Sequence, residues 1–214
     1  FNDALVEQFT NKLLFEEELS PKTVKDILVV LRSILNYIAK RFPDAFPRVD
    51  IVYPRENKKE MRVLTREEQA KFIRFLLKDI DTCKFGVLLA LLTGIRIGEL
   101  CALRWENISL RDNTIRISST MQRLKDMNPN REAKTKIVIG SPKSGTSTRT
   151  IPISDYAAEL CGKMNPQSPT AFVLTGTSDY MEPRTLQYRM EKYTAECGLE
   201  GVHFHTLRHT FATR

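Results

Sequence analysis

The stretch FGVLLALLTGIRIGELCALRW, residues 85–105, joins an apolar run to a glycine and a charged segment. Because its first part is apolar on every side, we predict a helix from about Lys84 to Leu92 in the core of a domain. This run is too short to span a bilayer. Gly94 should end the helix, and Arg96 should start a short second helix.

Caps and helical spacing predict further helices around this core. Ser20 before Pro21 pairs an N-cap with proline at the first helical position, and Thr65 with Glu68 three residues later forms a capping box. Other helices are expected after Ser154 and from Pro183 to Gly198.

Three runs have the alternation or β-branched character of strands: TIRISS (114–119), TKIVIG (135–140) and TRTIPI (148–153). They predict a small antiparallel sheet in a mainly α-helical, α+β protein. The segment MQRLKDMNPNREAK (121–134) exceeds what a tight hairpin needs, and we interpret it as an extended β-arm.

Two domains are expected. Residues 1–55 should form a small helical domain that begins upstream of Phe1 or rests on a partner, because so short a piece buries little apolar surface by itself. Prolines 43, 47 and 54 precede the polar run RENKKE, which predicts a linker at residues 56–63. Residues 64–214 should form the larger domain.

The net charge of +7 is concentrated in the larger domain. The first 60 residues are neutral, with ten Lys/Arg and ten Asp/Glu, whereas residues 111–149 hold nine Lys/Arg against three acids. This basic stretch is either a phosphate-facing surface or a solvated hairpin. If it faces phosphates, the positive excess of the β-arm indicates that the arm lies against DNA. The DNA contacts would then be Arg116, Arg123, Lys125, Lys134, Lys136 and Arg149.

Four widely spaced cysteines predict reduced core thiols and no disulfide set or zinc site. No stretch near the amino end reads as a signal peptide. We therefore expect a soluble, cytoplasmic protein without contact to a membrane.

Arg96 is a candidate phosphate ligand, because the N–H groups that begin a helix favour an anion and a guanidinium grips two oxygens in fixed geometry. Its structural alternative is a pair with Glu99, three positions on. Lys143 lies in a turn-rich segment, SPKSGTSTRT, from which it could reach a site across the sheet, although most loop lysines are only solvated.

All three histidines lie in HFHTLRHTFATR, residues 203–214. His205 and Arg208 are three apart and share a helical face, which places an imidazole beside a permanent cation. His205 and His209 have a spacing that suits a metal, but no HExxH pattern, acid or paired cysteine completes such a site. We predict no metal, and we interpret His203 and His209 as packing or surface residues.

TGIRIGELCALRW, PKSGTSTRTIPI and HTLRHTFATR, in this order, closely resemble the three signature regions of tyrosine recombinases, the phage-integrase family. Among members of this family, the sequence as a whole is most similar to integrases of conjugative transposons and temperate phages. The resemblance implies a core-binding domain at 1–55, a catalytic domain at 64–214 and a C-shaped clamp around duplex DNA.

The same resemblance implies four catalytic residues. Arg96 and Arg208 would hold the non-bridging oxygens of the scissile phosphate, Lys143 would protonate the departing 5′ oxygen, and His205 would assist proton transfer. Glu99 resembles the acid that holds the first arginine, so its pairing and the catalytic role of Arg96 are compatible.

The family's attacking tyrosine follows the His-x-x-Arg box by several tens of residues, and all six tyrosines here precede it. We therefore expect the nucleophile to lie beyond Arg214 and the catalytic domain in hand to be truncated before it. An arm-binding domain could also precede Phe1.

The resemblance predicts a site-specific recombinase that uses a 3′-phosphotyrosyl intermediate and needs no metal, cofactor or ATP. Its partners would be recombination-site DNA, further protomers in dimers or tetramers, and an accessory excision factor. A catalytically inactive, architectural DNA-binding protein is the alternative, and a type IB topoisomerase is a third hypothesis.

Overall fold

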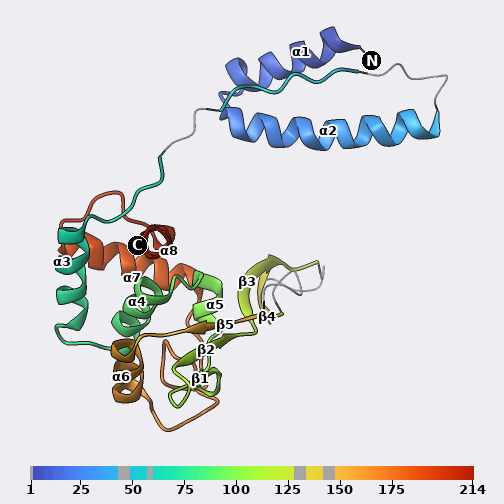
Figure 1. Ribbon diagram of the computed structural model, residues 1–214. Helices are drawn as coiled ribbons and strands as arrows, with labels where there is room; N and C mark the ends of the chain where they lie inside the picture. Colours follow the sequence, from blue (N-terminus) through green and yellow to red (C-terminus); the bar gives the residue numbers. More distant parts are fainter. Residues whose placement is uncertain (1, 43–48, 57–59, 128–133, 142–147) are drawn as a thin grey trace. The chain divides into compact units, whose positions relative to one another are not determined.

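The structure is a computed structural model that describes residues 2–42, 49–56, 60–127, 134–141 and 148–214. The chain divides into two compact units, Phe1–Glu60 and Met61–Arg214. Helices predominate and the strands are short and antiparallel (Figure 1), which confirms the expected α+β class. Within the described ranges, no helix has the length and apolar character needed to cross a membrane.

Unit 1 consists of α1 (Asp3–Asn11), a π-helical turn η1 (Lys12–Glu16) and α2 (Pro21–Arg41). The predicted start of α2 is confirmed: the Ser20 hydroxyl accepts a hydrogen bond from Thr23 N at 3.2 Å, and Pro21 follows. After α1 the chain passes through η1 and reaches a positive φ at Glu18, before α2 begins.

The core of unit 1 is small. Val6, Val24 and Leu28 are its buried residues, and the segment from Val49 to Tyr53 packs against them. Several large apolar side chains of this unit stay exposed, among them Phe15, Val30, Ile34 and Tyr37.

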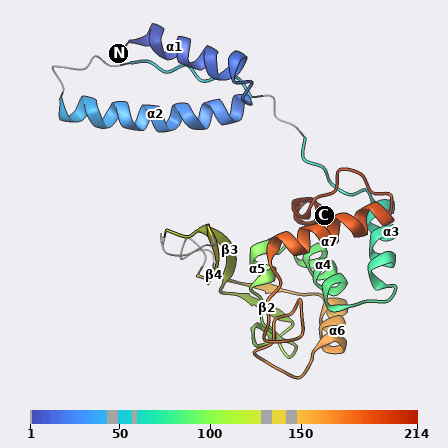
Figure 2. The same ribbon diagram turned by 180° about the vertical axis from the view of Figure 1, so that it is seen from behind.

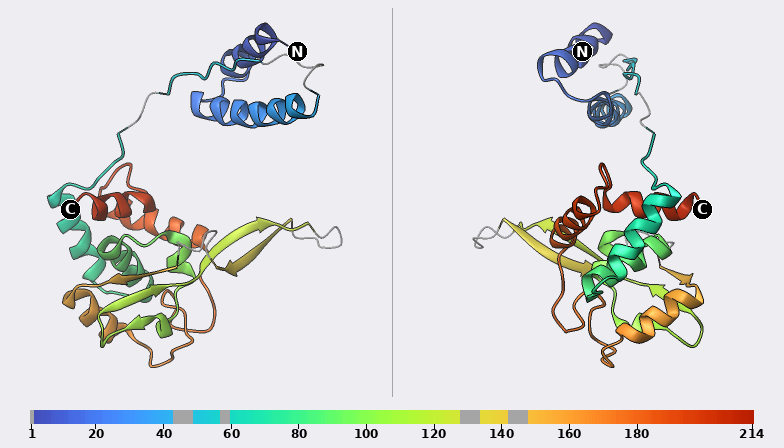
Figure 3. Two further views of the ribbon diagram at one scale, coloured as in Figure 1. Left: turned by 45° about the vertical axis from the view of Figure 1, so that its right-hand side comes forward. Right: turned by 90° about the vertical axis from the view of Figure 1, so that its left-hand side faces the viewer.

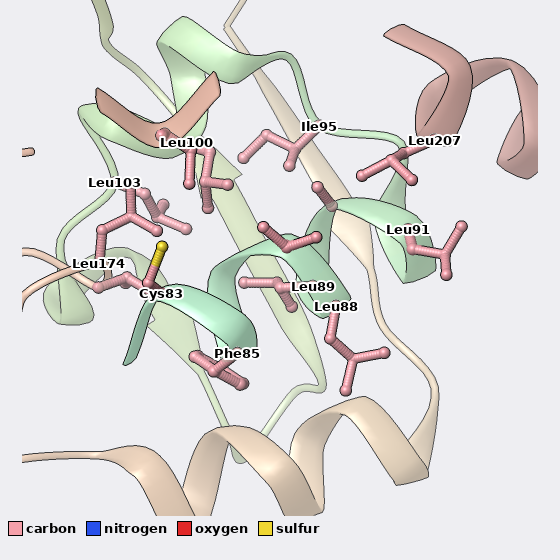
Figure 4. Packing of buried hydrophobic residues seen from close by; sticks show 14 of the residues in the cluster. Cys83, Phe85, Leu88, Leu89, Leu91, Ile95, Leu100, Leu103, Leu174 and Leu207 are labelled. Carbon is pink, nitrogen blue, oxygen red and sulfur yellow. The ribbon is translucent and has the colours of Figure 1, made fainter. Parts of the chain in front are cut away.

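Unit 2 is built around α4 (Thr82–Thr93), which is buried on almost every side (Figure 4). Apolar residues from the surrounding elements, including Leu100, Leu174 and Leu207, pack around it. The surrounding helices are α3 (Arg66–Leu77), α5 (Ile97–Cys101), α6 (Asp155–Met164), α7 (Pro183–Glu196) and α8 (Phe204–Ala212). The same arrangement is seen from behind in Figure 2.

The predicted caps of these helices are present. The Thr65 hydroxyl accepts from Glu68 N at 3.1 Å, and the Glu68 carboxylate accepts from Thr65 N at 2.8 Å, which completes the capping box. The Ser154 hydroxyl caps α6. Gly94, in the left-handed region, ends α4.

The strands form two sheets, where we expected one. In the first, β1 (Ile108–Ser109), β2 (Thr114–Ile117) and β5 (Arg149–Pro152) pair in the order β1-β2-β5. In the second, β3 (Thr120–Lys125) pairs with β4 (Thr135–Gly140) over six residues. The strand β3 falls in the segment we had interpreted as an arm, so the arm is a two-stranded ribbon. It stands out from the rest of unit 2 (Figure 3).

The helix α8 is fixed to the chain segment that enters α3. Leu64, which is fully buried, donates its backbone N–H to the Thr210 hydroxyl at 3.0 Å. The same hydroxyl donates to Thr206 O at 2.8 Å, and Arg214 donates to Leu64 O at 2.7 Å. Side chains of the α8 segment therefore satisfy both backbone polar groups of Leu64.

Replacing Thr210 by valine should destabilise unit 2 by about 1–3 kcal/mol, because the buried N–H of Leu64 loses its acceptor while the side-chain volume is kept. Thr213→Val is the matched control, since the exposed Thr213 hydroxyl also bonds a carbonyl of this helix. It should change stability by less than about 0.5 kcal/mol. Urea unfolding followed by the fluorescence of Trp105, which lies in this core, measures both. Equal effects of the two variants would contradict the anchoring role.

Candidate active site

Arg96 and Glu99 form the first part of the site, at the start of α5. Glu99 is buried, with 3% of its side chain exposed, while the Arg96 side chain is 53% exposed. The Glu99 carboxylate accepts from the Arg96 backbone N–H and from its Nη1, both at 2.9 Å. One of the N–H groups that the sequence argument assigned to a phosphate is therefore occupied by the protein's own carboxylate.

A second guanidinium reaches the same carboxylate. Arg149, at the start of β5, donates Nη1 to Glu99 Oε1 and Nη2 to Oε2, both at 2.8 Å. Burial by itself raises the pKa of the Glu99 carboxyl, but the hydrogen bonds from Arg149 and Arg96 outweigh it and lower the pKa to about 2. Glu99 is therefore ionised throughout the physiological range.

Arg208 approaches from α8. Its Nη1 donates to the carbonyl of Gly94, two residues before Arg96. Burial, followed by the positive charges of Arg96 and Arg149, lowers the pKa of Arg208 below its ordinary value. Three guanidiniums thus gather around one carboxylate, which leaves a local excess of two positive charges. Such a cluster favours binding of an anion.

Gly94 lets α8 lie against the end of α4. Its φ of +65° belongs to the left-handed region, and a Cβ there would come within 2.6 Å of the Phe211 ring. A side chain would therefore push Phe211, and with it the helix that carries Arg208, away from the cluster.

His205 and Arg96 line one hollow of about 540 Å³. Its walls also include Arg123, from β3, and Glu182 and Gln187, at the start of α7. A Cβ on Gly98, between Arg96 and β3, would lie 2.7 Å from the carbonyl of Met121, so glycine allows this close approach of helix and strand.

Of the four residues expected to be catalytic, the structure brings three into one region: Arg96, His205 and Arg208. Lys143 lies outside the described residues. Among those that are described, no three His, Cys, Asp or Glu side chains gather as a metal site. His203 is the N-cap residue of α8, and its backbone N–H donates to Thr206 Oγ1 at 3.1 Å.

Of the six residues expected to contact DNA, four lie on or next to the ribbon of β3 and β4, one lies on β2 and one at the start of β5. Arg116, on β2, and Lys125 and Lys134, on the ribbon, are exposed. Two other ribbon cations are paired within the protein. Arg123 bonds Glu182 and Thr135 Oγ1, and Lys136 lies 3.4 Å from the Asp126 carboxylate. Arg149 is held at Glu99, which the sequence did not indicate.

Sequence reasoning also missed Glu182, which holds Arg123 at the hollow. The only local feature of Glu182 in the sequence is its position before Pro183, where α7 begins, and this position does not indicate a pair with Arg123. None of the four tyrosines of unit 2 lines this hollow. Tyr193, for example, packs against Phe75 with ring centroids 5.9 Å apart, and burial raises its pKa.

Solved structures share this fold. The integrase of transposon Tn1549, in complex with a circular intermediate DNA, superimposes with a TM-score of 0.75 over 98% of this chain and 71% of that chain. The sequence identity is 17%, so this likeness concerns the fold alone.

Two curated relatives match nearly the whole chain. A tyrosine recombinase XerC-like protein of Caldanaerobacter subterraneus subsp. tengcongensis is 25% identical over 98% of this chain and 59% of its own length. A tyrosine recombinase of Pseudothermotoga lettingae is 29% identical over 97% of this chain and 66% of its own length. The chain thus spans about 60% to two thirds of these relatives.

The family model described as the phage integrase family matches residues 62–214. The matched range contains all three segments that carried the resemblance, which is confirmed. Because it covers well over half of the sequence, the chain belongs to the phage integrase family, that of the tyrosine recombinases.

Proposed function

We propose that this chain is the DNA-binding and catalytic part of a site-specific DNA recombinase of the integrase or transposase type. Unit 1 would supply the core-binding domain and unit 2 the catalytic domain. The observation that carries the proposal is the cluster of Arg96, Arg149 and Arg208 around Glu99, beside His205. A cationic site built this rigidly suits the phosphate of a DNA backbone.

The reaction would need neither metal nor ATP. A tyrosine oxygen attacks the scissile phosphorus, the P–O5′ bond breaks, and the 3′ phosphate stays on the tyrosine. The bond energy is kept in this ester, so a 5′ hydroxyl can later reverse the step and join strands. Arg96 and Arg208 stabilise the charge that grows on the equatorial oxygens.

Proton transfer completes the step. Lys143 would give its proton to the departing 5′ oxygen, as the resemblance implies. His205, which lines the same hollow as Arg96, would hydrogen-bond the phosphate and assist proton transfer.

The attacking tyrosine would come from outside residues 1–214. The location of the six tyrosines supports this part of the proposal. Tyr37 and Tyr53 belong to unit 1, Tyr156 to α6 and Tyr188 and Tyr193 to α7, while Tyr180 packs against Phe172 in a T-shaped arrangement. None of the four tyrosines in unit 2 lines the hollow.

Duplex recombination sites would be the substrate, bound inside the bacterial cell by dimers or tetramers of the protein, with an accessory excision factor as a further partner. The names of the matched proteins support this reading: two are tyrosine recombinases, and the Tn1549 integrase was solved with DNA of its transposon. The ribbon of β3 and β4, with Lys125 and Lys134, would lie along the backbone.

A covalent-capture experiment tests the proposal and identifies the site. The full-length protein is incubated, without ATP and with EDTA, with a pool of nicked duplexes of random sequence. When a nick lies a few nucleotides 3′ of the scissile phosphate in the same strand, cleavage releases a short fragment that carries the 5′ hydroxyl. This fragment diffuses away and cannot reverse the step, so the covalent intermediate accumulates. We expect DNA-protein adducts that survive boiling in detergent, whose peptide carries the nucleotide on a tyrosine, and whose DNA converges on one sequence. Binding without adduct would instead support the catalytically inactive, architectural alternative.

A further inference from the structure

Arg149 was expected to contact DNA, and its surroundings point to another task. Its side chain is 28% exposed, whereas that of Arg96 is 53% exposed. Two of its nitrogens donate to a carboxylate that is 3% exposed. A guanidinium bound in this bidentate way keeps little freedom to follow a DNA backbone.

We propose that Arg149 is a positioning residue that fixes Arg96 through Glu99. The proposal rests on the function proposed above, because Arg96 matters here as a ligand of the scissile phosphate. It assigns to Arg149 no contact with DNA.

The hydrogen bonds at Glu99 explain how one arginine can hold the other. Oε1 accepts from Arg96 Nη1 and Arg149 Nη1, and Oε2 accepts from Arg96 N and Arg149 Nη2. Each oxygen is therefore shared between the two arginines. Because the two Nη nitrogens of Arg149 engage both oxygens, the carboxylate plane cannot rotate without breaking one of these bonds. The Arg96 guanidinium, bonded to Oε1, is restricted with it.

The support beneath Arg149 is rigid. Arg149 begins β5, where it pairs with Ile117 of β2, a residue with 1% of its surface exposed. The sheet β1-β2-β5 thus positions the Arg149 guanidinium, which positions the Glu99 carboxylate. Glu99 in turn positions the exposed guanidinium of Arg96. A side chain held by packed elements in this way is prepared for an anion before the anion arrives.

The geometry distinguishes arginine from lysine at this position. A lysine keeps the positive charge but presents a single ammonium, which cannot donate two parallel hydrogen bonds to both carboxylate oxygens. Arg149→Lys therefore keeps the positive charge but removes the bidentate hydrogen bonds to Glu99, while Arg149→Gln removes both. Arg74→Gln, on the exposed face of α3, controls for the loss of one surface charge.

Two measurements on the full-length protein separate positioning from DNA contact. The first is affinity for a random-sequence duplex as a function of salt, which requires no cleavage. A lost phosphate contact reduces the slope of log K against log salt by about one. We expect the slope of log K against log salt for Arg149→Gln to lie within the range set by wild type and the control variant Arg74→Gln.

The second measurement is the single-turnover rate of adduct formation on the DNA sequence identified by covalent capture, at a saturating concentration of that DNA. We expect this rate to fall by about 10- to 100-fold in Arg149→Gln and to recover only partly in Arg149→Lys. The reason is that the bidentate hydrogen bonds of the guanidinium, and not its charge alone, position Glu99. The acid limb of the rate–pH profile should also move to higher pH in Arg149→Gln, because burial then raises the pKa of Glu99 with fewer hydrogen bonds to oppose it.

A double-mutant cycle tests the route through Glu99. If Arg149 acts through this carboxylate, Arg149→Gln should cost little further rate in a protein that already carries Glu99→Gln. Additive losses, full recovery by lysine, or a lower salt slope would each overturn the proposal. If wild type forms no adduct with any duplex, the proposed function fails, and the salt slope alone decides whether Arg149 contacts DNA.

Discussion

Replacing Arg208 by alanine in the full-length protein is expected to lower the single-turnover rate of DNA cleavage by about 100-fold or more. The reason is that its guanidinium is fixed before the substrate arrives, by the bond to the carbonyl of Gly94. The charge that develops on the phosphate oxygens would then lose a donor that needs no reorganisation. The rate of adduct formation on captured DNA measures the effect.

Controls for this variant separate chemistry from affinity. DNA affinity for Arg208→Ala should fall far less than the rate, because one phosphate contact among many is lost. Arg74→Ala removes an exposed guanidinium from α3 and should leave the rate unchanged. Cleavage by Arg208→Ala within about threefold of wild type would exclude Arg208 from the chemistry.

Replacing Glu99 by glutamine is expected to destabilise unit 2 by about 3–5 kcal/mol at neutral pH, as the loss of one partner from a buried ion pair commonly does. The amide cannot accept all four of the hydrogen bonds that the carboxylate receives, and it leaves the positive charges of Arg96 and Arg149 without their counterion. Urea unfolding monitored by Trp105 measures the change.

The pH dependence of that stability has a defined sign. The folded pKa of Glu99, about 2, lies below the ordinary value of 4.5, so its ionised form stabilises the fold above pH 4.5. As the pH falls from 4.5 towards 2, about 3 kcal/mol of this stabilisation should be lost in wild type and not in Glu99→Gln. The exposed Glu159, paired with Lys163, is the control. Glu159→Gln should leave unchanged both the stability at neutral pH and the stability that is lost between pH 4.5 and 2. Parallel pH curves for wild type and Glu99→Gln would contradict this account of the site.

Local signals in the sequence sufficed for most of the helices. Thr65 and Ser154 cap helices through bonds within three residues, and Gly94 ends α4 because its backbone adopts a positive φ. Such interactions depend on residue types at short spacing, so a single sequence reveals them. The division of the strands into two sheets was not predictable in this way, because pairing depends on long-range register.

The same distinction applies to the candidate site. The proximity of Arg96 and Glu99 could be predicted, because they are three residues apart at the start of a helix. The bond between Glu99 and Arg149 spans 50 positions, and the ion pair of Arg123 with Glu182 spans 59, so no local pattern contains them. The basic stretch was therefore interpreted by charge alone, although several of its cations have partners inside the protein.

The central claim is that fixed guanidiniums stabilise negative charge on a scissile phosphate. The most direct measurement compares wild type and Arg208→Ala on the captured DNA carrying either a normal phosphate or a methylphosphonate at the cleavage position. The methyl group replaces one charged oxygen, so the arginine has less charge to stabilise. We predict that the rate ratio of about 100 on phosphate falls to a few-fold on methylphosphonate. The same ratio on both substrates would contradict the claim.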